Sequence, residues 1–161
     1  MTECNKTITI VNYKGDLRCR HFSLAVKNGK IITPILNNYS RCKIFNTIKG
    51  SMHAEMNVLN YIVNTRNLYN GYSNDLHKYI HKSRKLNRFF KKIDIIVYRV
   101  GNDDQLLESK PCSECIKVLK KFNVKGVYYS KRNGTICYER IRNIKSNHLS
   151  QLTRWNRRQG L

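Results

Sequence analysis

Two short motifs carry the residues best suited to chemistry in this 161-residue chain. The first is His-Ala-Glu at 53–55, and the second is Pro-Cys-Ser-Glu-Cys at 111–115. One imidazole and two thiolates are the ligand set of a catalytic zinc ion, which keeps its fourth tetrahedral position for water. The sequence therefore predicts Zn²⁺ as a cofactor, held by His53, Cys112 and Cys115.

A carboxylate beside these ligands can move protons. Glu55 stands two residues from His53 and is not needed to bind the metal. Zinc lowers the pKa of a bound water to roughly 7–9, and an amine that leaves during hydrolysis must be protonated. We therefore expect Glu55 to be the catalytic general acid and base.

Together, the two motifs resemble the signature of the cytidine deaminase-like zinc deaminases. The resemblance covers roughly residues 20–130 and includes the order hairpin, ligand helix, strand, ligand helix, strand. It implies zinc binding by the imidazole and both thiols, acid and base catalysis by Glu55, and hydrolysis of cytosine to uracil. A Cys-x-x-Cys pair alone also suits a structural zinc half-site or a redox pair, but neither explains the His-Ala-Glu motif.

The resemblance also concerns the substrate. The family usually places an asparagine near the end of its second strand to contact the sugar, and Asn37 and Asn38 stand at that point. Either one is a candidate substrate-binding residue. Both also suit a turn, so the choice between these interpretations stays open.

The elements around the motifs alternate in type and predict an α/β fold. Asn28-Gly29 marks a hairpin turn, and a second Asn-Gly at 133–134 marks another, so the last two strands are expected to be antiparallel neighbours. The resemblance implies a three-layer α/β/α sandwich around a mixed sheet of about five strands with this antiparallel end. The predicted elements are a hairpin over Arg20–Leu36, a helix from Ala54, a buried strand over Ile93–Val100, a helix near Cys112, and strands over Val124–Tyr129 and Thr135–Ile141.

The length predicts a single domain over residues 1–161. Two parts are strongly basic: an insertion at about 64–92, with eight Lys or Arg against Asp75, and a C-terminal segment at about 142–161. No apolar run approaches the ~20 residues of a membrane span, and no secretory signal opens the chain. We expect no membrane partner, reduced cysteines, and an intracellular location in the cytoplasm or nucleus, with a viral setting left open.

The net charge of +21 points to polyanionic partners. Cationic grooves with stacking rings hold single strands, so we predict that the substrate is cytosine in single-stranded nucleic acid or in nucleotides. The alternatives are a free cytidine or deoxycytidylate deaminase, and a basic nucleic-acid-binding protein that keeps the fold without turnover. The resembled family often forms dimers or tetramers, which leaves a homo-oligomer open. Some of the aromatic residues in the basic parts must belong to the core, and the others are candidates for stacking on bases. They are Tyr69, Tyr72, Tyr79, Phe89, Phe90, Tyr128, Tyr129, Tyr138 and Trp155.

Overall fold

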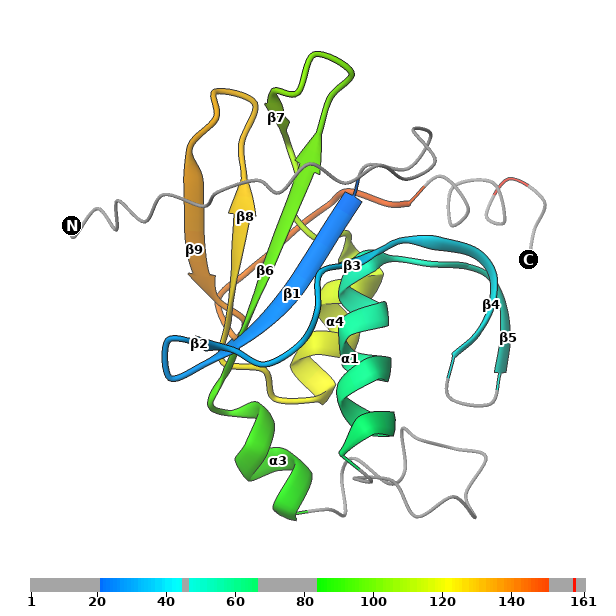
Figure 1. Ribbon diagram of the computed structural model, residues 1–161, viewed down its shortest axis with the longest axis vertical. Coiled ribbons are helices and arrows are strands. Elements are labelled where there is room, and N and C mark those ends of the chain that lie inside the picture. Colours follow the sequence, from blue (N-terminus) through cyan, green and yellow to red (C-terminus); the bar gives the residue numbers. More distant parts are fainter. Residues whose placement is uncertain (1–20, 45–46, 67–83, 151–157, 159–161) are drawn as a thin grey trace.

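The computed structural model describes residues 21–44, 47–66, 84–150 and 158 of the chain. These residues form an α/β arrangement with a mixed, open sheet of seven strands, a separate two-stranded sheet and, within the described ranges, three helices (Figure 1). The strands are β1 (His21–Lys27), β2 (Lys30–Ile31), β3 (Leu36–Asn37), β4 (Tyr39–Ile44), β5 (Thr47–Met52), β6 (Ile93–Val100), β7 (Leu106–Leu107), β8 (Gly126–Ser130) and β9 (Ile136–Arg140). The helices are α1 (Ala54–Thr65), α3 (Arg84–Phe90) and α4 (Ser113–Lys121).

The main sheet runs in the order β2-β1-β6-β8-β9, and the short strands β3 and β7 pair with β1 and β6. Strand β6 is antiparallel to β1 and parallel to β8, whereas β8 and β9 are antiparallel. The predicted mixed sheet with an antiparallel end is therefore confirmed. It has seven strands rather than about five, because two-residue strands extend the pairing of β1 and β6.

The predicted first hairpin is present, with a turn at Asn28-Gly29. Both turn residues have positive φ, 50° and 78°, which is the conformation that a two-residue hairpin turn requires. The return strand breaks after Ile31 and resumes at Leu36, with Pro34 in the gap. Because proline has no N–H to donate, the ladder is interrupted there. The Thr33 hydroxyl accepts a hydrogen bond from the Ala25 N–H at 2.9 Å instead.

One face of the main sheet carries the hydrophobic core. Alternate residues of the central strand β6, Ile93, Ile95 and Val97, point to this face and pack with buried residues of all three described helices. Helices α1 and α4 lie side by side beneath the sheet in Figure 1. The central strand, predicted over Ile93–Val100, has those bounds.

The opposite face of the sheet carries a second apolar set. Phe22 stacks on Tyr98 with ring centroids 5.2 Å apart, and Leu24 is buried. The described helices all contribute to the first core, so in the described ranges the helical layer covers one face. A second helical layer, which a three-layer sandwich needs, has no member among the described residues.

The predicted basic insertion at about 64–92 ends in structured core. Within helix α3, Leu86 and Phe90 are almost fully buried, and the Phe90 ring meets Phe122 edge to face at 5.0 Å. Phe90 and the buried Tyr129 are therefore core residues and are excluded as stacking surfaces for bases. The other aromatic candidates of the insertion, Tyr69, Tyr72 and Tyr79, lie outside the described residues, as does Trp155.

The basic C-terminal segment also begins in the core. Ile144 is fully buried, and its carbonyl accepts a hydrogen bond from the Lys120 ammonium at 3.1 Å. The Ser113 N–H donates to the His148 carbonyl, so this segment crosses the start of α4. Within the described residues, none of the helices combines the length and apolar character that crossing a membrane requires.

Candidate metal centre

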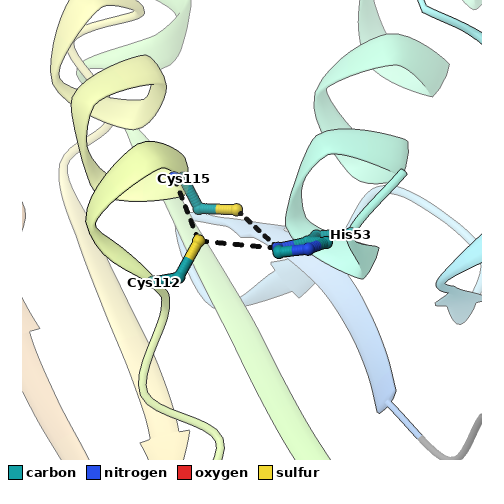
Figure 2. A group of neighbouring side chains, drawn as sticks. All are labelled: His53, Cys112 and Cys115. Atoms are coloured by element: carbon teal, nitrogen blue, oxygen red, sulfur yellow. Dashed lines mark hydrogen bonds between the residues drawn. The ribbon is translucent and has the colours of Figure 1, made fainter. Parts of the chain in front are cut away.

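The three predicted metal ligands converge between the starts of two helices. Figure 2 shows the His53 ring, which immediately precedes α1, facing the sulfurs of Cys112 and Cys115 at the start of α4. The His53 Nδ1 lies 3.2 Å from the Cys115 sulfur and 3.6 Å from the Cys112 sulfur. The three ligand atoms all lie within 4.8 Å of one another.

Local backbone structure explains how both helices present ligands. His53 and Cys112 occupy the N-cap positions of α1 and α4, and both have extended backbone angles. At an N-cap, the side chain can turn back toward the free N–H groups of the first turn, which Cys112 does and His53 does not. The Cys112 sulfur accordingly accepts a hydrogen bond from the Cys115 N–H at 3.5 Å. The positive end of α4 also favours the thiolate form.

The distances fit a tetrahedral zinc ion. Bond lengths of about 2.3 Å to sulfur and about 2.0–2.1 Å to nitrogen place a tetrahedral sulfur and nitrogen roughly 3.5 Å apart. The observed separations of 3.2 and 3.6 Å lie on either side of this value. The donor set is thus suited to zinc, with three protein ligands and a fourth position for water. Other metals that accept nitrogen and sulfur are compatible with the same geometry.

Hydrogen bonds within the triad set its protonation. The hydrogen bond from Cys115, helped by one from His53, lowers the pKa of the Cys112 thiol to about 4. The hydrogen bond between Cys112 and Cys115 raises the pKa of the Cys115 thiol, and burial raises it further. The hydrogen bond between His53 and Cys112 raises the pKa of the His53 imidazole. The lowered pKa favours the thiolate form of Cys112, which is the form that binds metal. A metal ion held by these residues would favour loss of the Cys115 thiol proton as well.

Glu55 lies in the first turn of α1, two residues after His53, and is 5% exposed. Burial raises the pKa of its carboxyl, and the charge of His53 partly offsets this rise. A carboxyl whose pKa is raised toward the working pH can both accept and donate a proton. The predicted acid and base therefore has the electrostatic surroundings that this role needs.

The two predicted substrate contacts lie at the end of β3: Asn37 is its last residue and Asn38 follows it. The backbone carbonyl of Asn37 accepts a hydrogen bond from the Asn57 side chain at 3.0 Å, which ties β3 to α1. The side-chain oxygen of Asn38 is buried and has no hydrogen-bond partner. Asn38 thus has a free acceptor near the site.

Sequence reasoning assigned no role to two residues that the sheet brings to this end. His21 at the start of β1 lies directly opposite Arg99 near the end of β6. The charges of His53 and Cys112 both act on His21, so it belongs to the surroundings of the metal centre. His21 and Arg99 come together only through the antiparallel register of two strands that are about 70 residues apart in the sequence, so no local motif could have indicated them.

Comparison with protein-family models, with curated proteins and with solved structures gave no match.

Proposed function

We propose that this protein is a zinc-dependent hydrolytic deaminase that converts cytosine to uracil in single-stranded nucleic acid or in nucleotides. The observation that carries the proposal is the meeting of His53, Cys112 and Cys115 at two helix starts, with the buried Glu55 two residues after His53. Ligand set, carboxylate and order of elements are similar to those of the cytidine deaminase-like zinc deaminases. We further propose that the described sheet and its one helical layer are part of a sandwich of that type, whose second helical layer would have to come from residues outside the described ranges.

The reaction is the hydrolysis of the bond between C4 of cytosine and its amino group. Zinc, when bound, is a Lewis acid that makes water acidic enough to lose a proton near neutral pH. Glu55 would accept that proton and deliver it to the ring nitrogen, and it would then carry the second water proton from the added hydroxyl to the departing amine. The water oxygen becomes the uracil carbonyl, the carbon–nitrogen bond breaks, and ammonia leaves, so atoms and charge balance.

Charge supports a phosphorylated substrate. The chain has 31 Lys or Arg but 10 Asp or Glu, so most cations have no acidic residue available to pair with. Such a surplus attracts phosphates and promotes their association with the protein. A base in a single strand is also easier to reach than one stacked in a duplex.

A free cytidine or deoxycytidylate deaminase is the second candidate. The observation that favours its free-cytidine form is the antiparallel pairing of β8 and β9, with a tight turn at Gly134. This end of the sheet is similar to the free-nucleoside branch of the family, whereas the branches acting on polynucleotides and on deoxycytidylate usually place a helix between these strands. The two candidates share the same metal centre and differ in substrate.

The decisive experiment supplies the zinc-loaded full chain with single-stranded DNA, RNA, cytosine nucleotides and nucleosides, and measures uracil, inosine and ammonia. We expect uracil and ammonia, their loss with a chelator, and their return with added zinc. Glu55→Gln should lower kcat by at least about 100-fold while zinc stays bound.

Glu114→Gln is the matched control, because this exposed carboxylate lies between the two cysteines and pairs with Lys117. It should keep near-normal activity. Full zinc occupancy with no uracil or inosine from any substrate would overturn the proposal and favour the basic nucleic-acid-binding protein without turnover.

A further inference from the structure

Several buried polar atoms without partners belong to residues at the end of the sheet where α1 begins or at the start of α4. Four buried side-chain atoms of the described residues make no hydrogen bond: His21 Nε2, Ser23 Oγ, Asn38 Oδ1 and Ser113 Oγ. A buried polar atom left unpaired destabilises the fold, so each such atom calls for an explanation, such as a catalytic role or a bound water or ion. A polar ligand would pair with these atoms.

Strand register brings three of these atoms to one place. His21 and Ser23 are two residues apart on β1 and therefore point to the same face of the sheet. The Asn38 N–H donates to the His21 carbonyl, which sets these two residues opposite each other. Ala25, further along the same face, belongs to the core beneath the helices. The three atoms thus lie on the helix-bearing face, at the end of the sheet where α1 begins.

Cationic groups gather at the same point. Arg99 lies opposite His21 on β6, on the same face, and its side chain is exposed. Burial, followed by the charges of Arg99, His53 and His148, lowers the pKa of His21 to about 4, although the charge of Cys112 partly opposes this. His21 is therefore neutral at pH 7 and can donate one hydrogen bond, while Arg99 keeps its charge.

The C-terminal segment adds the third group. Its backbone is held at the start of α4, because the Ser113 N–H donates to the His148 carbonyl at 2.9 Å. The His148 side chain is exposed, and its charge acts on His21. Arg99 forms no ion pair with the acidic residues that the structure describes. The N–H donors of the Arg99 guanidinium are therefore available to bind an anion.

We propose that His21, Arg99 and His148 form a phosphate-binding subsite beside the metal centre, so that the substrate is a cytosine nucleotide rather than a nucleoside. This inference rests on the proposed deaminase function and names its substrate class. Arginine binds phosphate through two parallel hydrogen bonds, and phosphate offers acceptor oxygens to the imidazoles. The phosphate belongs either to a free nucleotide or to a strand, and the chemistry of recognition is the same.

The test measures binding separately from turnover. Zinc-loaded protein carrying Glu55→Gln is titrated calorimetrically with deoxycytidine, with deoxycytidine 5′-monophosphate, and with a short single strand that contains one cytosine. We expect at least one phosphorylated ligand to bind about tenfold or more tightly than deoxycytidine. Adding Arg99→Gln should reduce this advantage to less than about threefold, and Arg99→Lys should restore part of it.

The matched control is Arg88→Gln, which removes an exposed arginine from α3, at the far end of the molecule from the start of α1 (Figure 1). It should leave the phosphate advantage intact. Equal binding of deoxycytidine and both phosphorylated ligands, or an equal loss in the Arg88 and Arg99 variants, would overturn the subsite.

The two proposals fail separately. An advantage that depends on Arg99, in a protein that produces no uracil when Glu55 is intact, would refute the deaminase and support the phosphate subsite. Uracil production by a protein that binds the nucleoside and the nucleotides equally would support the deaminase and refute the phosphate subsite. An Arg99-dependent advantage confined to the monophosphate or to the strand supports the subsite and identifies the source of the phosphate.

Discussion

Cys112 combines two roles in one side chain. Its sulfur caps the first turn of α4 by accepting from the Cys115 N–H, and it also faces His53 as a metal ligand. Both roles favour negative charge on the sulfur, since the helix start and the hydrogen bonds stabilise a thiolate. The helix thus prepares the ligand before a metal ion binds.

His21 makes stability depend on pH in a definite direction. Its pKa falls from 6.5 to about 4 on folding, with burial as the main cause. Between these values the unfolded chain binds a proton that the folded chain does not, so stability is full above pH 6.5 and declines as the pH falls toward 4. We expect this residue alone to cost about 2 kcal/mol between about pH 7.5 and about pH 5.

Urea unfolding at the two pH values checks this, with His21→Gln as the comparison. Because the variant keeps the metal ligands, any stability that both proteins lose through zinc release at low pH is the same in the variant and in the parent protein. Its stability should decline less with acidification, by about the amount assigned to His21. The same decline in both proteins would contradict the assignment.

The helices that carry the ligands begin at the same end of the sheet because β6 stands between them in the chain. Helix α1 precedes this strand, and α4 follows it after the β7 turn. Both pack on one face of β6 through a shared core, so their N-termini come together. The metal centre is therefore a consequence of sheet topology as well as of the two motifs.

Phe90 should anchor α3 to this core. It is fully buried and meets Phe122 edge to face, whereas its neighbour Phe89 is partly buried and lies beneath the cations of Lys27 and Arg66. Replacing a buried phenylalanine with alanine costs about 3–5 kcal/mol. We expect Phe90→Ala to lose about this much in urea unfolding and Phe89→Ala to lose distinctly less. Equal losses would show that α3 is not anchored as described.

The secondary-structure elements that the sequence could predict are those encoded by residues close together in the chain. The Asn28-Gly29 turn, the β-branched run of β6 and the N-terminal parts of α1 and α4 are each encoded within a few neighbouring residues. The strands β3 and β7 have two residues each, too few for a strand pattern to show in the sequence, and they were not predicted. The pairing of β4 with β5 was not predicted either.

The candidate site divides in the same way. His53, Glu55, Cys112 and Cys115 lie in two compact motifs whose residue types indicate their chemistry. His21, Arg99 and His148 come from three separated segments, and only the folded sheet brings them to one end. Helix α3 was assigned to a basic insertion because its composition is polar, yet its two buried residues place it in the core.

The charge of the whole molecule should govern its association with nucleic acid. With a net charge of +21, binding to a single strand displaces counterions, and log K falls with log salt concentration in proportion to the phosphates neutralised. We expect the affinity for a short single strand to fall at least about tenfold between about 50 and about 200 mM salt. Fluorescence anisotropy measures this, with a labelled mononucleotide as the comparison of lower charge. An affinity insensitive to salt would contradict a role for the net charge.

The zinc K-edge absorption spectrum of the purified full chain tests the metal centre most directly. The account predicts one zinc ion per chain, with two sulfurs at about 2.3 Å and two lighter atoms at about 2.0–2.1 Å, one from His53 and one from water. Cys137→Ser, which removes a thiol outside the triad, should leave the spectrum unchanged, whereas Cys112→Ser should lose a sulfur or the metal. A spectrum with three or four sulfurs, or a chain that binds no zinc, would contradict the proposed catalytic centre.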